Sequence, residues 1–536
     1  MISLSKASLL VLGLTAACIG CGDTGPPLSV PVNAREGDFS TERFRWRTGA
    51  MWNNDAPGFD AERGVIIVPE NRRKTGSRLI ALPFVRIHAT VPTREPVMIL
   101  GGGPGSPNIL KGLPDWAIEL LAAHDLVMPG YRGAEGSTVL DCPEITGALK
   151  GTGGDLLGAA ARARIVAAMS ESARRLRRNG VDLEGYTIDQ VAADCEAIRS
   201  GLGYERVNLV SLSYGTRVAQ VFARQYPERV RRSAMIGVNP PGHFLWEPAS
   251  VDSLILRYSA LWGKDSLQRS RTPDLAGTIK SVVASMPRRW FLFPIDRGKV
   301  RVVTFAMMFH RNSAAMTFDA YADAGRGDAA GLALMSVAYD FIMPSMSVWG
   351  DFFAKGGTDY DSTRSYAAEM DPPGSIIGSP FSLLIWPAAA SPGAWPIVLL
   401  PDSLRRVGPS DVETLLVSGN LDASTPAEAA TKEMLPVLRR GRQVVLADMG
   451  HCNDLTGAQP EAFAHLLGEF LARGVVDTSQ FAPHPMKFHT GMGLAGIARI
   501  IVAVLVVLAA AFVVLAWYVV SWLVGEFRSR RSVLSQ

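Results

Sequence analysis

The segment VNLVSLSYGTRVAQVFARQYP, residues 207–227, contains the turn on which the prediction of the fold rests. Residues 207–210 form an apolar run typical of a buried strand, and apolar residues recur at helical spacing from Thr216 onward. Ser213 lies in the turn between them, with a small residue two positions before it and two positions after it. Such a turn can hold a serine hydroxyl clear of the backbone, near the N-terminus of the following helix. The segment therefore predicts a nucleophilic serine, with an ordinary strand-to-helix turn as the alternative.

Strand and helix patterns alternate on both sides of this turn. The strand patterns lie at 64–69, 78–88, 97–100, 126–128, 234–238, 414–417 and 442–446, and the helical patterns at 115–123, 187–202 and 461–473. Alternation of this kind is typical of a mostly parallel sheet with helices on both faces. We therefore expect an α/β fold with a doubly wound sheet.

One long block interrupts the alternation. After the Asn-Pro-Pro-Gly segment at 239–242, residues 243–409 are helical in pattern, irregular, and rich in Met and Trp. We interpret this block as a mainly helical cap inserted between two parts of the core, 63–242 and 410–473. An insertion at this point would cover the carboxyl edge of the sheet, where folds of this class place their sites.

The N-terminal residues resemble an export signal. The apolar run 7–17 is too short to cross a bilayer as a helix, and we assign 1–21 to the signal. Small residues precede Cys18 and Cys21, as at bacterial lipoprotein processing sites. Lipidation at either cysteine, simple cleavage and an uncleaved segment are all left open. Residues 22–62 are expected to form a linker and an N-terminal extension.

The C-terminal part is typical of a membrane anchor. Residues 500–524 contain no charge, are rich in Val, Leu and Ala, and are long enough to cross the hydrocarbon core. The segment 474–499 before them is expected to be a juxtamembrane linker. Arginines follow in the tail 525–536, which indicates a cytoplasmic tail and a large domain on the extracytoplasmic side of a bacterial membrane. The expected location is therefore the cell envelope.

Composition argues against some classes of function. The chain has 536 residues, of which 48% are hydrophobic, and its net charge is +4. This small charge, without a basic stripe interleaved with aromatic residues, does not indicate a nucleic-acid binder. We expect no cofactor and no metal, and the oligomeric state stays open.

An exported domain permits disulfides. Beyond the signal region the chain contains Cys142, Cys195 and Cys452. Cys142 follows an expected strand and Cys195 lies on the helix before the serine turn, so these two are a candidate pair. Three buried free thiols are the alternative, and the sequence leaves both open.

A nucleophilic serine needs a base, and the base needs an orienting acid. Asp422 follows the strand pattern 414–417 in SGNLDASTP, and His451 follows the next strand pattern in DMGH. Both residues would lie at the same edge of a parallel sheet as the serine turn. We therefore predict Ser213, Asp422 and His451 as a catalytic triad. A helix-capping aspartate and an ordinary surface histidine are the alternatives.

The sequence GGGPG at 101–105 directly follows the strand pattern 97–100. Glycines allow backbone N–H groups to turn toward a substrate carbonyl, and Gly102 and Gly103 are the candidate donors here. Together with the N–H of Tyr214 they would form an oxyanion hole. A phosphate-binding loop is the competing interpretation, but the G-x-G-x-x-G spacing and a Gly-Lys-Ser/Thr ending are both missing.

These motifs together resemble a known family. The GGGPG loop, the turn RGAEGS at 132–137, the segment SLSYGTRVAQVFARQYPERV and GNLDASTP with the later Gly-His are similar to the proline iminopeptidase and tripeptidyl-aminopeptidase branch of the α/β-hydrolases. The order serine, aspartate, histidine along the chain is also the order of that fold. Gly101, Ser211 and Gly130 stand where the family usually has histidine, glycine and aspartate.

The resemblance implies that Ser213 attacks a substrate carbonyl and that water activated by His451 releases the acyl-enzyme. It also implies that acidic groups of the cap bind the free amine of a peptide. The cap offers Asp319, Asp323, Asp328, Asp340 and Asp351, of which none is assigned. The expected function is an exported, membrane-anchored serine hydrolase that removes N-terminal residues or short peptides. A carboxylesterase or lipase with the same triad, and a non-catalytic envelope binding protein on the same fold, are the alternatives.

Overall fold

The computed structural model describes residues 28–47, 58–150, 154–489 and 491–533, and within 524–533 it describes only the helical backbone. The export signal expected over 1–21, with Cys18 and Cys21, lies outside the described residues. The side chains of the arginine-containing tail 525–536 lie outside them as well.

A nine-stranded sheet forms the centre of the described structure, in the order β1-β2-β3-β5-β4-β8-β9-β12-β13. The strands are β1 (Phe39–Arg47), β2 (Gly58–Pro69), β3 (Leu79–Ile87), β4 (Val97–Leu100), β5 (Leu126–Pro129), β8 (Val207–Leu212), β9 (Val230–Ile236), β12 (Glu413–Gly419) and β13 (Gly441–Leu446). The pairs from β1 to β5 are antiparallel, and those from β5 to β13 are parallel. The predicted mostly parallel sheet is confirmed, although β9 begins four residues earlier than the pattern 234–238.

Helices cover both faces of the sheet. The core helices are α2 (Asp115–Leu120), α5 (Ile188–Gly201), α6 (Tyr214–Gln225), α17 (Ala427–Ala429), α18 (Asn453–Gly457) and α19 (Pro460–Arg473). Alternate residues of β8 point to opposite faces: Leu209 belongs to the apolar cluster with α5 and α6, and Val210 to the cluster with α2 and α19. Burial on both faces explains why the central strands are continuous apolar runs rather than alternating ones.

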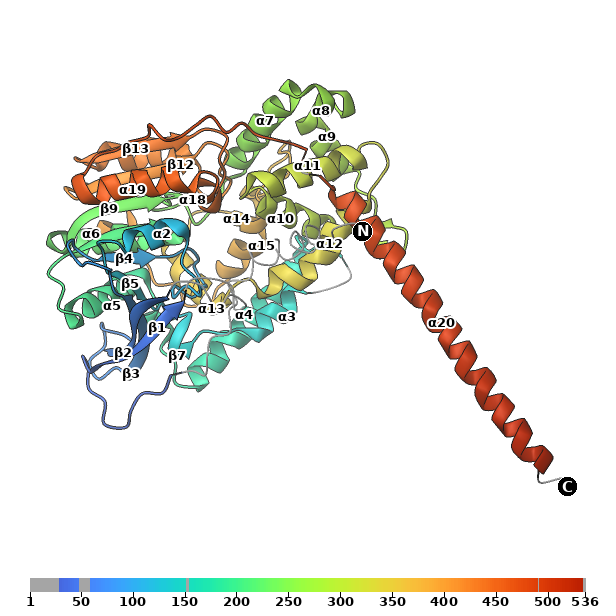
Figure 1. Ribbon diagram of the computed structural model, residues 1–536, viewed down its shortest axis with the longest axis horizontal. Coiled ribbons are helices and arrows are strands. Elements are labelled where there is room, and N and C mark those ends of the chain that lie inside the picture. Colours follow the sequence, from blue (N-terminus) through green and yellow to red (C-terminus); the bar gives the residue numbers. More distant parts are fainter. Residues whose placement is uncertain (1–27, 48–57, 151–153, 490, 534–536) are drawn as a thin grey trace.

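The block between β9 and β12 is mainly helical, as expected of a cap. It contains α7 (Pro248–Lys264), α8 (Ser266–Arg271), α9 (Leu275–Ala284), the hairpin β10 (Arg289–Trp290) and β11 (Phe293–Pro294), α10 (Arg297–Met307), α11 (Arg311–Ala324), α12 (Ala330–Ile342), α13 (Trp349–Gly356), α14 (Tyr366–Glu369), α15 (Pro380–Ala389) and α16 (Asp402–Arg405). Figure 1 shows most of these helices gathered to one side of the sheet.

The first part of the core contributes to this helical side. After the small sheet of β6 (Arg132–Gly133) and β7 (Glu135–Val139), the chain forms α3 (Pro143–Leu149) and α4 (Ala159–Arg178). Helix α4 packs against α15 of the cap. The cap therefore rests on a pair of helices that precede the serine turn in the chain.

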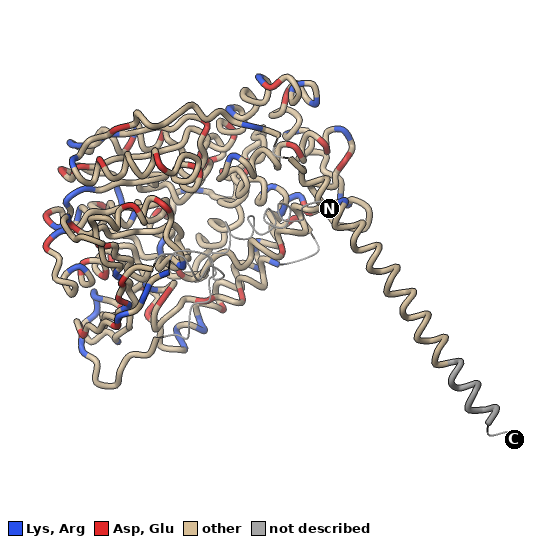
Figure 2. Tube along the Cα trace, viewed as in Figure 1, with Lys and Arg blue, Asp and Glu red and all other residues tan. Residues whose placement is uncertain are grey.

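The C-terminal helix α20 (Leu494–Val533) projects from the rest of the structure (Figure 1). Its segment Leu494–Leu523 has a mean hydropathy of 3.1 and is long and apolar enough to cross a membrane. The sequence has no charged residue from Ile500 to Leu523, and Figure 2 draws the projecting helix in tan up to the part that is not described. The helix begins six residues before the apolar run expected from the sequence, and its first turn packs against α12.

Candidate active site

Ser213 occupies the sharp turn between β8 and α6. Its backbone has φ 53° and ψ −120°, a conformation that costs a non-glycine residue of order 1–3 kcal/mol. The N–H of Ser213 donates to Ile236 O of β9 at 2.9 Å. Gly215 approaches the end of β4 so closely that a Cβ there would lie 2.0 Å from Leu100 O, so only glycine fits. The turn expected from the sequence is present, and neighbouring strands hold it in shape.

The three positions that differ from the usual family pattern each have a local structural reason. Ser211 is fully buried, and its hydroxyl donates to a carbonyl of β9 at 3.2 Å. A Cβ on Gly130 would lie 2.7 Å from Pro83 O, and a Cβ on Gly101 would lie 2.8 Å from Asn108 Oδ1. Close packing against the backbone of β3 therefore requires glycine at 130, whereas a side chain at 101 would have to displace the Asn108 amide.

His451 and Asp422 form a buried pair in the loops that follow β13 and β12. His451 Nδ1 lies 2.7 Å from Asp422 Oδ2, and the exposed fractions of the two side chains are 9% and 0%. Asp422 Oδ1 accepts the N–H groups of Ser424 and Thr425 at 2.7 Å and 2.9 Å. Burial alone would lower the pKa of His451, but the charge of Asp422 raises it, and the resulting pKa lies well above 6.5. This is the geometry in which an acid orients a histidine base.

Thr425 joins the pair and was not among the residues predicted from the sequence. Its hydroxyl lies 2.7 Å from Asp422 Oδ2 and 3.1 Å from His451 Nδ1. A signal was present, because an aspartate commonly accepts donors two and three residues later in its own turn. The threonine helps to fix the carboxylate that contacts the histidine.

The end of β9 links the serine turn to the histidine. Ile236 O accepts the N–H of Ser213 at 2.9 Å and the S–H of Cys452 at 3.4 Å. A Cβ on the next residue, Gly237, would lie 3.0 Å from His451 Cε1. Within the described part of the chain the Ser213 hydroxyl has no hydrogen-bond partner, and His451 Nε2 lies 3.5 Å from Cys452 Sγ. The three residues predicted as a triad thus lie at the same edge of the sheet.

The glycine loop after β4 lies beside Ser213. A Cβ on Gly102 would lie 3.5 Å from Ser213 Cβ, and a Cβ on Gly103 would lie 3.6 Å from Tyr214 Cδ1. Among the residues that the structure describes, no acceptor is available to the backbone N–H groups of Gly102, Gly103 and Tyr214. Tyr214 begins α6, where free N–H groups carry partial positive charge. The arrangement fits an oxyanion hole.

Helix α13 of the cap holds the far end of this loop through a buried ion pair. Lys355 Nζ and Asp351 Oδ1 are in direct contact, and both side chains are fully buried. Asp351 Oδ2 accepts the N–H of Gly105 at 3.0 Å. Lys355 Nζ also donates to Arg132 O at 2.9 Å and lies 5.9 Å from the centre of the Tyr214 ring. Because a buried charge needs its partner, this pair couples the cap to the glycine loop.

Cap residues also contact the loops that carry the acid and the base. Phe309 O accepts the N–H of His451 at 2.6 Å, and the two rings lie 5.4 Å apart. Trp246 Nε1 donates to Ser424 O at 2.9 Å, and its ring packs 5.3 Å from those of two phenylalanines. The cap therefore places an aromatic wall next to the histidine loop.

Each of the five aspartates considered for a substrate amine has a cationic partner within the chain. The pairs are Asp319 and Asp323 with Arg271, Asp328 with Arg499, Asp340 with Lys299, and Asp351 with Lys355. A substrate amine would have to displace one of these partners. The structure thus singles out none of the five as an amine ligand.

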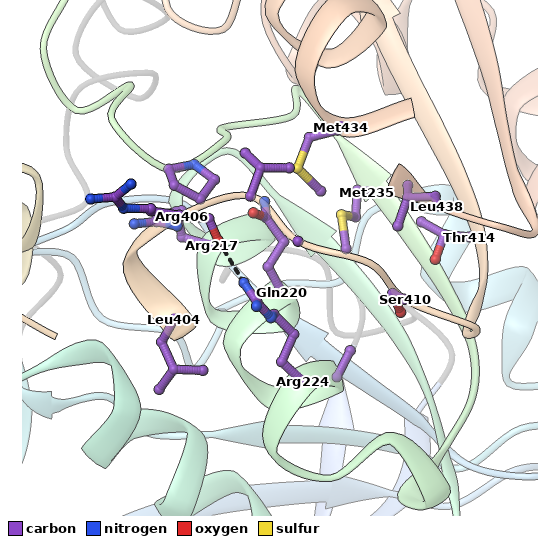
Figure 3. A pocket seen from close by; sticks show the side chains of 14 residues that line it. Arg217, Gln220, Arg224, Met235, Leu404, Arg406, Ser410, Thr414, Met434 and Leu438 are labelled. Carbon is purple, nitrogen blue, oxygen red and sulfur yellow. Dashed lines mark hydrogen bonds between the residues drawn. The ribbon is translucent and has the colours of Figure 1, made fainter. Parts of the chain in front are cut away.

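A small cavity lies between α6 and residues 404–410 (Figure 3). Arg217 and Arg224 of α6 and Met235 of β9 line it. Its volume is about 20 Å³, room for about one water molecule. Arg217 is fully buried and pairs with Asp359 of the cap at 3.0 Å. The cavity is too small for a peptide or an ester, and we interpret it as part of the packing between core and cap.

Cys142 and Cys195, considered as a disulfide pair, are separate buried thiols in the structure. Cys142 lies just before α3, and its Sγ is directed at Leu140 O, 3.4 Å away in its own turn. Cys195 lies on the buried face of α5. Burial raises the pKa of the Cys142 thiol to about 12. The bridge is therefore not formed, and the alternative of buried free thiols is the one that the structure supports.

These features define the class of protein. A family model of the alpha/beta hydrolase fold matches residues 95–260, which contain the glycine loop, the serine turn and β9. The match and the mostly parallel sheet show that the chain has the α/β-hydrolase fold.

Its curated relatives include peptidases. The chain is 27% identical over 223 residues to the tripeptidyl aminopeptidase of Streptomyces lividans, a match that covers 38% of this chain and only 41% of that relative. The serine protease Hip1 of Mycobacterium tuberculosis matches a shorter stretch of 51 residues. The identity there is 39%, and the stretch covers 10% of each chain. Among solved structures, the match to a serine hydrolase from Cycloclasticus zankles covers 82% of this chain and 100% of that hydrolase. The sequence identity is 12% and the TM-score is 0.34. The chain therefore has the α/β-hydrolase fold, and part of it is similar to peptidases.

Proposed function

We propose that Ser213 is the nucleophile of a serine hydrolase, with His451 as the general base and Asp422 as the residue that orients it. The observation that carries the proposal is the buried 2.7 Å contact between His451 Nδ1 and Asp422 Oδ2, at the same edge of the sheet as a serine held at φ 53°. Because Nδ1 faces the carboxylate, Nε2 is the nitrogen left to accept the serine proton.

In the proposed reaction the Ser213 oxygen attacks the substrate carbonyl carbon while its proton passes to His451 Nε2. The carbonyl oxygen becomes negative and accepts hydrogen bonds from the N–H groups of Gly102, Gly103 and Tyr214. His451 then returns the proton to the leaving group, which departs and leaves an acyl-enzyme. Water attacks the acyl carbon with His451 again as base, which releases the acid and restores the serine.

We propose peptide N-termini as the substrates and N-terminal residues or short peptides as the products. The similarity to a tripeptidyl aminopeptidase supports this choice. The aromatic wall formed by Phe309 and Trp246 offers apolar surface for peptide side chains next to the histidine loop.

A carboxylesterase is the second candidate, and one observation favours it. The five cap aspartates considered above are all engaged in ion pairs, whereas an ester substrate has no amine that needs a carboxylate. The proposed triad and oxyanion hole act on esters and amides alike.

Labelling of the serine tests the triad before any substrate is known. The full chain should react with a fluorophosphonate probe, and Ser213→Ala should abolish labelling without lowering the melting temperature. Ser211→Ala is a matched control in the same turn, and it should retain labelling. A folded wild-type chain that is not labelled would favour the non-catalytic binding protein.

Substrate profiling then separates the two enzymatic candidates. The aminopeptidase proposal expects turnover of aminoacyl- or tripeptidyl-arylamides, and Ser213→Ala should lower their rate by about 10⁴-fold or more. Turnover of short acyl esters without turnover of any arylamide would reject the peptidase and leave the carboxylesterase.

We further propose that α20 anchors the enzyme in a membrane, with the catalytic part on the extracytoplasmic side after an export signal within 1–21. The length and hydropathy of Leu494–Leu523 support the anchor, and the arginines of the tail support a cytoplasmic C-terminus. Protease added to intact spheroplasts should digest the catalytic part and spare a C-terminal tag. Digestion of the tag would contradict the orientation.

A further inference from the structure

The hairpin of β10 and β11 has an apolar tip that packing within the chain does not explain. Its two turn residues, Phe291 and Leu292, have exposed fractions of 65% and 79%. Phe291 has a φ of 51°, so the turn presents large apolar side chains at some cost in backbone strain. Arg288 and Arg289, separated from the tip by Trp290, are exposed, and neither has an ion-pair partner in the part of the chain that the structure describes.

The hairpin is attached to the first turns of α20. Trp290 packs against a buried cluster that α12 forms with Ala495 and Ala498 of α20. Arg499 on the same helix pairs with Asp328, which precedes α12. The uncharged run begins directly after Arg499, so the packed alanines lie within about one and a half helical turns of it. Figure 1 shows α20 leaving the globular part beside α11 and α12.

We propose that the hairpin tip is a second membrane contact, in which Phe291 and Leu292 enter the interfacial region of the bilayer that α20 crosses. The inference rests on the membrane anchoring proposed above. Large apolar side chains next to arginines are the composition that binds where headgroups meet acyl chains. Arg288 and Arg289 would face lipid phosphates, which are acceptors of matching charge. The hairpin packs against the first turns of α20, which is an apolar helix of membrane-spanning length. Its tip is therefore more suited to contact a lipid surface than a protein partner.

A second contact changes how the cap sits on the membrane. A single helix can tilt in the bilayer and carry the globular part with it. Two contacts joined through α12, which touches both the hairpin and α20, hold the cap against the bilayer surface.

The experiment compares three single-cysteine positions in the full chain, reconstituted in vesicles of phosphatidylcholine and phosphatidylglycerol. Leu292→Cys tests the tip, Val507→Cys reports on the middle of α20, and Leu256→Cys on α7 is a matched exposed apolar site with a fraction of 56%. The introduced cysteine of each variant carries an environment-sensitive fluorophore. Brominated acyl chains quench a fluorophore that lies in the lipid, and iodide quenches one that lies in water. All three variants also carry serine in place of Cys18 and Cys21. The remaining cysteines, Cys142, Cys195 and Cys452, are buried thiols and stay unchanged.

The proposal expects the probes at 292 and 507 to be quenched by brominated lipid, and to be protected from iodide at least about threefold relative to the probe at 256. Strong iodide quenching at 292 with a protected 507 would overturn the hairpin contact and leave the anchor intact. Iodide quenching at both would overturn the anchor as well. A probe at 292 shielded from both quenchers would show that protein, a second copy or another partner, covers the tip and would overturn the lipid contact. Melting temperatures equal to that of the unlabelled chain exclude misfolding, and none of these outcomes depends on catalysis.

Discussion

At the scale of single residues, Asp422 is a carboxylate shielded from water whose charge is balanced by its neighbours. It contacts His451, the hydroxyl of Thr425 and two backbone N–H groups, all within 2.9 Å. Burial of such a group is tolerated only because its oxygen atoms have partners. The same carboxylate raises the pKa of His451, so it would set the pH at which His451 acts as the proposed base.

The pH dependence of hydrolysis follows from this pair. His451 must be neutral to accept a proton, and its pKa lies well above 6.5, so the rate should rise with pH through that pKa. Asp422→Asn removes the charge that raises the pKa while burial still lowers it. The rising limb should therefore move to lower pH, and the maximal rate should fall about 10⁴-fold. Profiles of kcat/KM from about pH 5 to about pH 10 measure both effects.

A second aspartate–histidine pair provides the matched control. Asp477 lies 2.9 Å from His465 on the surface, and Asp477→Asn should leave the profile unchanged. A rising limb at the same pH in wild type and Asp422→Asn would contradict the assignment of His451 as the base.

At the scale of elements, the cap is part of the site rather than a cover over it. Helix α13 holds the glycine loop through Asp351, and the turn before α11 holds the histidine loop through Phe309 O. Two cap segments, neither of which carries a residue of the proposed triad, thus contact the glycine loop and the histidine loop. Movement of the cap would change the proposed oxyanion hole and the proposed base together.

The buried pair in α13 gives a test at this scale. Asp351→Asn leaves the Lys355 ammonium without a counter-charge and should lower the free energy of unfolding by about 3–5 kcal/mol. Asp411→Asn, which breaks an exposed pair with Arg439, should cost less than about 1 kcal/mol. Melting temperatures of the two variants give the comparison.

A double variant separates stability from positioning. Asp351→Leu with Lys355→Met removes both charges and should recover most of the melting temperature, but the N–H of Gly105 then lacks its acceptor. Turnover should stay below that of the wild type. Full recovery of kcat together with stability would contradict the positioning of the loop by Asp351.

At the scale of the whole molecule, the described parts of the segment expected as a juxtamembrane linker, 474–489 and 491–499, pack against core and cap. Phe488 is buried, with its ring 5.2 Å from that of Trp262. Arg311 donates to His484 O at 2.9 Å, and the N–H of Met486 donates to Asp448 Oδ2 at 2.9 Å. The segment therefore joins α20 to the cap as a packed connection rather than as a free tether.

Two truncations test this connection. A chain that ends at Arg499 keeps Phe488 and the packed first turn of α20, and it should be water-soluble with the melting temperature of the full chain. A chain that ends at Arg473 loses Phe488 and should be less stable by about 3 kcal/mol or more, as for deletion of a buried phenylalanine side chain. Equal melting temperatures of the two truncated chains would contradict the packed connection.

The fold was predictable because its signals are local. The apolar run of β8, the small residues around Ser213 and the strand that precedes Asp422 each lie within a few residues, and strand ends of a parallel sheet meet at one edge. The positions of the triad candidates followed from these signals, while their catalytic roles stay a prediction. Thr425 was missed although it stands three residues after Asp422, because a threonine there is also common in turns without function.

The sequence by itself determined the class of fold, the apolar length of α20 and the edge of the sheet at which the serine, aspartate and histidine stand. Only the tertiary structure decided that Asp351 supports the glycine loop from 246 residues away, that Cys142 and Cys195 stay apart, and that Trp290 of the hairpin packs against the first turns of α20. The physical reason is the separation along the sequence over which each kind of interaction acts. Periodicity and turn chemistry act over a few neighbouring residues, whereas pairing of buried charges and packing of side chains depend on which distant segments the folded chain brings together.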